Sequence, residues 1–387
     1  MSEVFLVECL DYQRARVEEA INQLIDALAD IEKIIKPGTQ VLLKVNLLSP
    51  SKPEKAVTTH PEVVRAVTKN FIARGARVWV GDSSGGIIPG SNRTSQALEV
   101  SGVRAAVDSC GGEIVNFDTA GVVEFENPRG QAFEKIYIAK PVLEADVVVS
   151  MPKLKTHMLT VFTGAVKNMY GCVPGARKAW YHQVAPGINE FSDYLVDIFA
   201  LAKPHLAIMD GIVGMEGDGP AAGDPRTVGA LIAGYDSVAV DAVCCQLIGL
   251  DPHKIQMLTK ASARKLGVLS SAEIQVHGPF AQRKQKKYKV RQRGLQPPAF
   301  IMKHSLNWMQ AYPVINQGKC IGCDLCYSSC PVKSISKGEK GLLIKREQCI
   351  RCYCCHELCP ATAVDLKSNR LGAWIRSAYE QRINKAR

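Results

Sequence analysis

The chain contains no uncharged apolar run of about 18 residues, so we expect no membrane-spanning helix. Its start has an acidic residue at position 3 and no basic region before an apolar core, which argues against an export signal. The glycine loop at residues 81–86 matches neither the dinucleotide fingerprint G-x-G-x-x-G nor the Walker loop, so neither nucleotide site is expected there. With 47% hydrophobic residues, the composition is that of a folded soluble protein.

Cysteine, in contrast, is abundant, with 14 residues, and eight of these form two runs of C-x2-C-x2-C-x3-C-P. Each cysteine of the second run lies 29 residues after its counterpart. This spacing is typical of two cubane iron-sulfur clusters, in which three thiolates of a run bind one cluster and the fourth binds the other. The expected ligands of the first 4Fe-4S cluster are Cys320, Cys323, Cys326 and Cys359, and those of the second are Cys349, Cys352, Cys355 and Cys330.

Zinc and structural disulfides are the alternatives, but neither predicts a duplicated four-cysteine run with a proline after each last member. Cys354 is a ninth thiol within the second run. We interpret it as a bystander in the turn, with tuning or substitution of a ligand as the alternative.

The segment 312–366 resembles a bacterial two-cluster ferredoxin, and both runs match that family without departure. About 55 residues form only a marginal hydrophobic core, so folding is expected to depend on the bound clusters. Cluster cysteines in a chain without an expected export signal favour a reducing, cytoplasmic location.

The rest of the chain leaves room for a large domain over 1–280, a basic linker over 281–311 and a basic amphipathic tail over 367–387. Residues 281–387 carry 21 Lys and Arg against 6 Asp and Glu, a balance of +15, whereas residues 1–280 carry 27 against 31, a balance of −4. The linker is either a solvated connection or a docking strip for an acidic electron-carrier protein or redox enzyme. No motif supports nucleic acid as a partner. We expect the tail to pack back on the protein, with peripheral membrane contact as the alternative.

In the N-terminal part, short apolar runs alternate with helical stretches, which favours an α/β fold with a mainly parallel sheet flanked by helices. The expected strands are 41–45, 78–80, 147–149 and 206–209. Apolar residues at helical spacing predict one helix over 13–34. A second helix should start at Thr59, capped by its hydroxyl and by Glu62, with His60 in the first turn as a structural residue.

Polar residues follow each expected strand, and ligands of open α/β sheets bind beyond the carboxyl ends of strands. We therefore predict a pocket whose lysines favour a small anionic substrate. The groups are Lys44 and Asn46, then Asp82, Ser83 and Ser84, then Lys153, Lys155 and His157, and finally Asp210, Glu216 and Asp218. Lys167 and Asn168 would join them if an expected helix over 159–170 points back to the third strand.

Other features have simpler interpretations. The acidic glycine-rich stretch 217–225 does not match the EF-hand pattern, so we interpret it as a turn and keep a hard-metal loop as the alternative. Cys244 and Cys245 fall in an apolar stretch and are expected to be core thiols. Cys172 lies in an expected loop and is the isolated cysteine to check for reactivity.

Four short segments of this part resemble an iron-sulfur family that carries the domain of unknown function numbered 362. They are Lys44-Val45-Asn46, Gly81-Asp82-Ser83, the run from Lys153 to His157, and Lys167-Asn168. The resemblance covers about 1–260 and then the ferredoxin-like segment. It implies an α/β domain fused to a two-cluster electron-transfer domain, and it names no reaction.

Three functions remain open. In the first, a reductase or redox accessory enzyme passes electrons through the clusters to the pocket, with Lys44, Lys153 and Lys155 anchoring an anion. Asp82, His157 and Asp210 would then be proton donors or metal ligands. In the second, a non-catalytic electron carrier docks to another redox enzyme. In the third, the clusters sense redox state and change the affinity of a binding module.

Overall fold

The computed structural model describes residues 1–84, 93–127, 135–174, 178, 181, 185, 187–285, 287–290, 312–328, 330, 332–339, 341–349, 351, 354–357 and 359–367. Most of the expected linker and nearly all of the expected tail lie outside these residues. Within the part of the chain that the structure describes, no helix is long and apolar enough to cross a membrane.

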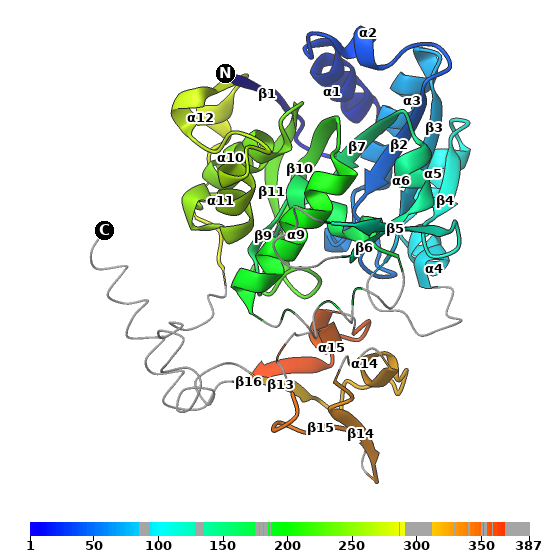
Figure 1. The fold of residues 1–387 in the computed structure, drawn as a ribbon, viewed down its shortest axis with the longest axis vertical. Helices are drawn as coiled ribbons and strands as arrows, with labels where there is room; N and C mark the ends of the chain where they lie inside the picture. Colours follow the sequence, from blue (N-terminus) through cyan, green and yellow to red (C-terminus); the bar gives the residue numbers. More distant parts are fainter. Residues whose placement is uncertain are drawn as a thin grey trace.

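A ten-stranded mixed sheet forms the centre of the N-terminal part, with the order β12-β1-β11-β10-β7-β2-β3-β4 and with β8 and β9 branching from β10 (Figure 1). The run β10-β7-β2-β3-β4 is parallel, whereas β11 is antiparallel to both of its neighbours. The strands are β1 (Ser2–Glu8), β2 (Gln40–Val45), β3 (Arg77–Asp82), β4 (Glu113–Asn116), β7 (Val147–Met151), β8 (Lys153–His157), β9 (Val161–Thr163), β10 (Leu206–Glu216), β11 (Asp224–Gly234) and β12 (Ile274–His277). A separate hairpin joins β5 (Val122–Glu126) and β6 (Lys135–Ala139).

Helices cover both faces of the sheet, because its central strands are apolar on both sides. Val41 and Leu43 belong to one core cluster, whereas Leu42 between them belongs to the other. The first cluster includes residues of α1 (Arg14–Asp26), α2 (Ile31–Ile34), α3 (Pro61–Ala73), α4 (Arg93–Val100) and α5 (Val103–Asp108). The second includes residues of α6 (Lys140–Glu144), α7 (Ala165–Asn168), α9 (Ile188–Ala202), α10 (Ser237–Leu247) and α11 (Gln256–Ala263). The expected α/β class and all four expected strands are confirmed.

Short elements complete this part: α12 (Phe280–Arg283) and the 3-10 turns Pro53–Lys55, Met169–Cys172, Pro252–Lys254 and Ser271–Glu273.

Three local predictions were wrong. The helix expected over 13–34 is two helices, because Asp30 between them has a left-handed φ of 55°. Thr59 does not cap α3. Its hydroxyl donates to the Met151 carbonyl, 2.6 Å away, and His60 is the capping residue. The helix expected over 159–170 is strand β9 followed by the short α7 and a 3-10 turn.

The C-terminal module is built from a duplicated half. Strand β13 (Tyr312–Ile315), helix α14 (Leu325–Ser328) and strand β14 (Ile335–Gly338) recur 29 residues later as β15 (Gly341–Ile344), α15 (Cys354–Glu357) and β16 (Val364–Lys367). Each hairpin takes one strand from each half, because β13 pairs with β16 and β14 pairs with β15. The module lies on the side of the α/β domain that carries α4 (Figure 1).

Candidate redox site

Four cysteines from both halves of the C-terminal module line one pocket. Cys320, Cys323 and Cys326 come from the first run, and Cys359 comes from the second. Apolar side chains complete the walls, among them Ile315, Leu342 and Val364. Four thiols lining one largely apolar pocket fit an iron-sulfur cluster, which is held by cysteine thiolates. When bound, such a cluster takes up and releases single electrons.

The backbone around the fourth cysteine of each run is arranged to donate hydrogen bonds to sulfur. The Ser334 amide donates to Cys330 Sγ over 3.2 Å, and the Ala363 amide donates to Cys359 Sγ over 3.1 Å. Each turn contains a residue in left-handed conformation, Lys333 and Thr362 respectively. Such bonds stabilise thiolates, which suits both cysteines as metal ligands.

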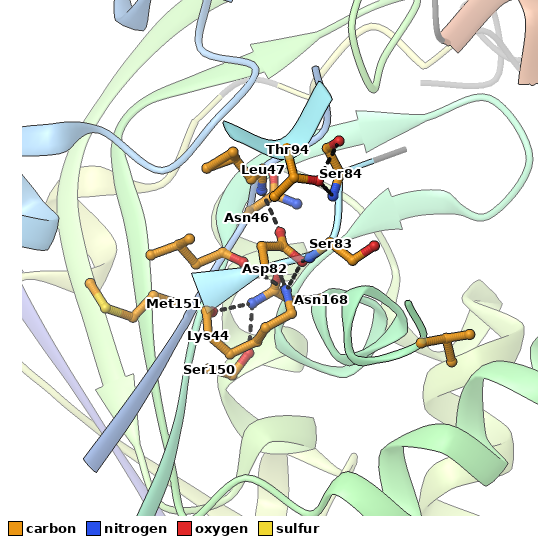
Figure 2. A network of polar contacts seen from close by, with 12 residues as sticks. Lys44, Asn46, Leu47, Asp82, Ser83, Ser84, Thr94, Ser150, Met151 and Asn168 are labelled. Carbon is orange, nitrogen blue, oxygen red and sulfur yellow. Dashed lines mark hydrogen bonds and ion pairs between the residues drawn. The ribbon is translucent and has the colours of Figure 1, made fainter. Parts of the chain in front are cut away.

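In the α/β domain, the carboxyl ends of β2 and β3 hold a buried ion pair (Figure 2). Lys44 Nζ lies 2.8 Å from Asp82 Oδ1, and the two side chains are 0% and 3% exposed. Asn168 donates to the Lys44 carbonyl over 2.8 Å and to Ser150 Oγ over 3.1 Å. Burial raises the pKa of Asp82, and the positive charge of Lys44 opposes this shift.

A second chain of polar contacts continues from Asp82 towards α4. The Ser84 amide donates to Thr94 Oγ1 over 3.0 Å, and both Thr94 and Ser83 donate to the carboxylate of Asp118. Lys178 donates to the Ser83 carbonyl over 2.7 Å and also to the Ser83 hydroxyl. Burial lowers the pKa of Lys178 to about 8, against the opposing charges of Asp118 and Asp82. A lysine with such a pKa can give up a proton near neutral pH.

Lys153 and Asp210 form another buried pair, with 2.8 Å between Nζ and Oδ2 and no exposure of either side chain. The Tyr12 hydroxyl lies 2.6 Å from Lys153 Nζ and donates to Asp210 Oδ1 over 2.8 Å. The His60 ring stacks on Tyr12 with 3.5 Å between centroids, and burial lowers the pKa of His60 to about 4. Lys153 and Asp210 thus neutralise one another within the protein.

The remaining predicted groups have local partners. Lys155 Nζ donates to the Val57 carbonyl over 2.6 Å. His157 Nδ1 accepts from the amides of Leu159 and Thr160, so its role is to fix the turn after β8. Glu216 pairs with Arg226. Lys167 Nζ lies 5.7 Å from the centre of the Tyr170 ring.

Lys153, Lys155 and His157 were expected in a loop after the third strand, but they form strand β8, which pairs with β10. The structure therefore brings Lys44, Asn46, Asp82, Ser83 and Ser84 together, and gathers Lys153 with Asp210. Among the residues it describes, no group of three or more His, Cys, Asp or Glu is arranged to hold a single metal ion.

Three thiols of the α/β domain, at positions 172, 244 and 245, are core residues. Cys244 and Cys245 are fully buried, which confirms the prediction, and burial raises the pKa of both thiols well above the ordinary value. Cys172 is also fully buried, and burial raises its pKa to about 12. A thiol in this state is unreactive at neutral pH.

The described residues include a packing contact and an electrostatic interaction between the C-terminal module and the α/β domain. Met158, in the turn after β8, packs against Leu366 of β16, and both are largely buried. Arg93, the first residue of α4, is 3% exposed and lies within electrostatic range of Cys323 and Cys359. The cysteine-lined pocket therefore faces the end of the α/β domain that carries Thr94.

Comparison with known proteins identifies both parts. The model of a domain of unknown function, DUF362, matches residues 41–246, and a 4Fe-4S dicluster domain matches residues 312–360. The chain belongs to the DUF362 family. The predicted resemblance, a DUF362 domain fused to a ferredoxin-type module, is confirmed, and the protein has an iron-sulfur electron-transfer role.

This DUF362 protein is 34% identical to the thylakoid-associated protein sll1697 of Synechocystis sp. (strain ATCC 27184 / PCC 6803 / Kazusa) over 274 residues. The match covers 70% of this chain and 81% of the relative. A lactate racemase apoprotein from Thermoanaerobacterium thermosaccharolyticum gives a TM-score of 0.37 at 12% identity, over 61% of this chain and 54% of that one. The chain thus spans about half the length of that solved structure.

Sequence reasoning missed several residues that interact with the predicted groups: Tyr12, Arg93, Thr94, Asp118 and Lys178. Thr94 and Asp118 lie 10 and 24 positions from groups that they contact, and Lys178 lies 95 positions from Ser83. No local pattern could have linked them, because only the fold brings them together.

Proposed function

We propose that this protein is a reductase or redox accessory enzyme that binds two 4Fe-4S clusters and delivers their electrons to an acceptor at the α/β domain. The first cluster would be held by Cys320, Cys323, Cys326 and Cys359, and the second by Cys349, Cys352, Cys355 and Cys330. Support for crossed sets comes from the pocket, which joins Cys359 to three cysteines of the other run.

The observation that carries the proposal is the position of Arg93. It lies near two cysteines of the first ligand set, and the next residue, Thr94, is bonded to Ser84. A short sequence of contacts therefore connects that cluster site with the Ser83–Asp82 end of the sheet. An electron leaving the cluster at this side would reach polar groups able to bind an acceptor.

Reduction of an organic acceptor by two electrons also requires protons. Lys178 is the best-placed donor, because its pKa is about 8 and its ammonium group contacts Ser83. Lys44 and Lys153 are neutralised by buried carboxylates. In the proposal, an anionic group on the acceptor would therefore interact with Lys178 rather than with either of them.

The test is anaerobic reoxidation of the reduced full-length protein, followed by visible absorbance, with separate small-molecule and protein fractions of host extract. We expect the small-molecule fraction to reoxidise the clusters. Lys178→Met should slow this reaction by about a hundredfold or more, as loss of a general acid does. Lys254→Gln is the matched control, because that lysine side chain is 83% exposed. Equal rates in all three proteins would refute the role of Lys178.

An electron carrier that docks to another redox enzyme is the second candidate, and exposed apolar residues on the C-terminal module favour it. Ile321, at the rim of the cysteine pocket, is 68% exposed, Tyr327 is 43% exposed and Leu343 is 54% exposed. Together with the basic C-terminal region, they would suit an acidic partner. Reoxidation by the protein fraction alone, weakening steeply as salt rises, would favour this function.

A further inference from the structure

We propose that Arg93 is a positioning residue for the cluster held by Cys320, Cys323, Cys326 and Cys359, and that this cluster is the one from which electrons leave for the α/β domain. The other cluster would then receive electrons first. This inference rests on the proposed function for the direction of transfer, whereas the placement of Arg93 rests on the structure alone.

The first support is the way in which Arg93 is held. Its side chain is 3% exposed, which is unusual for an arginine and implies a fixed position. Thr94, its neighbour in α4, is anchored by Ser84 and Asp118. Arg93 therefore belongs to the turn of α4 that these contacts anchor to the α/β domain.

The second support is the packing between the two parts. Leu366 contacts Met158, and Leu366 lies two residues after Val364, which lines the cysteine pocket. Strand β16, which carries both residues, is paired with β13 over its whole length. This contact places β16, which carries a residue of the cysteine pocket wall, against the α/β domain.

The third support is electrostatic. Burial lowers the pKa of Arg93, while the thiolates of Cys323 and Cys359 oppose that shift. These two cysteines belong to different runs but to the same crossed set, so a single cation interacts with one cluster site through both halves of the module. Arginine remains protonated in proteins. A fixed positive charge favours the reduced cluster, which carries one more negative charge than the oxidised form.

The second cluster, for which Cys330 is a predicted ligand, has a different neighbouring group. The Ser334 hydroxyl lies 3.2 Å from Cys330 Sγ, whereas the equivalent position after Cys359 is Ala363, which has no hydroxyl. Hydrogen bonds to sulfur raise the potential of a cluster. Arg93 and Ser334 should thus tune different clusters, and substitutions at these two positions can tell the clusters apart.

The experiment is a redox titration of the anaerobically reconstituted full-length protein, followed by electron paramagnetic resonance with no acceptor present. In Arg93→Gln, we expect the reduced-to-oxidised ratio of one cluster, at a fixed potential, to fall about tenfold, as loss of a partly screened charge predicts. In Arg93→Lys, which keeps the positive charge, the reduced-to-oxidised ratio of this cluster should be close to that of the unmodified protein. Arg104→Gln, which removes an arginine with a 34% exposed side chain, is the matched control. Ser334→Ala should lower the ratio of the other cluster only.

A shift confined to one cluster, and to the cluster that Ser334→Ala leaves unchanged, would support the proposal. A shift of both clusters, of neither, or of the same cluster in both variants would overturn it. If Arg93→Gln binds too little iron, Arg93→Lys against Arg93→Met makes the same comparison. Since no acceptor takes part, this result is independent of whether the α/β domain reduces a substrate.

Discussion

Gly171 lies against Asp82 so closely that a methyl group on its α-carbon would come within 2.1 Å of Asp82 Oδ1. The same methyl group would come within 2.5 Å of Lys44 Nζ. Asp82 also accepts hydrogen bonds from the amides of Leu47 and Ser83. Lys44 Nζ also donates to the Val45 carbonyl, so both partners are held in place. Only glycine fits beside this ion pair.

We therefore expect Gly171→Ala to lower the free energy of unfolding by about 2 to 4 kcal/mol, since overpacking would disturb a buried charge pair. Chemical denaturation of the full chain would measure the change. Gly38→Ala is the control. Gly38 has no neighbour within 4 Å of the added group and a φ of +85°, so that variant reports backbone strain alone, about 1 kcal/mol. Equal losses in the two variants would contradict the close approach.

The Lys44–Asp82 pair itself can be tested by a double-mutant cycle. Each single replacement, Lys44→Met or Asp82→Asn, leaves a buried partner without its counter-charge and should cost about 3 to 5 kcal/mol. The double variant should cost clearly less than the sum, because it leaves no unpaired charge. Additive losses, measured by the same denaturation, would show that the two groups do not depend on one another.

The sheet could be predicted because its central strands are buried on both faces. Residues 41–45 and 147–149 are short, wholly apolar except for Lys44, and bounded by polar residues. Strand β8 could not be predicted, because Lys153, Lys155 and His157 are all buried in it. In a sequence, charged residues at alternate positions indicate a strand that is exposed to solvent. Burial of these side chains is energetically acceptable only because internal partners such as Asp210 compensate their charge.

The prediction of the cluster cysteines has a different basis, since the spacing of cluster ligands is set by the geometry of the metal site rather than by the fold. The position of the module relative to the α/β domain could not be predicted. It depends on Met158, which packs on Leu366, and on Arg93, which interacts electrostatically with Cys323 and Cys359. No sequence pattern marks either residue.

His60 should make stability depend on pH. Its folded pKa is about 4 against an ordinary 6.5, because burial disfavours the charged ring more strongly than the nearby Asp210 carboxylate favours it. As pH falls below about 6.5 the unfolded chain takes up this proton first, so stability is lost between pH 6.5 and 4 and no further below. We expect His60 to account for about 3 kcal/mol of that loss.

His60→Asn provides the comparison, because asparagine also accepts at a helix N-cap but does not titrate. The variant loses the stacking on Tyr12 at every pH, so its overall stability falls. The informative quantity is the slope of unfolding free energy against pH, which should be shallower between pH 6.5 and 4 than in the unmodified protein. Parallel curves would mean that His60 titrates normally in the folded state.

The crossed ligand sets predict which cysteine replacements remove the same cluster. Cys326 and Cys359 lie in different runs but line one pocket, so Cys326→Ala and Cys359→Ala should each remove the same cluster and lower bound iron from about eight atoms to about four. Cys330→Ala should remove the other cluster, and Cys354→Ala should retain both. Iron analysis with electron paramagnetic resonance identifies which signal is lost, and circular dichroism checks that the α/β domain remains folded. If Cys359→Ala and Cys349→Ala instead removed the same cluster, each run would bind its own cluster, and the exchange of strands between the halves would have no counterpart in the metal ligands.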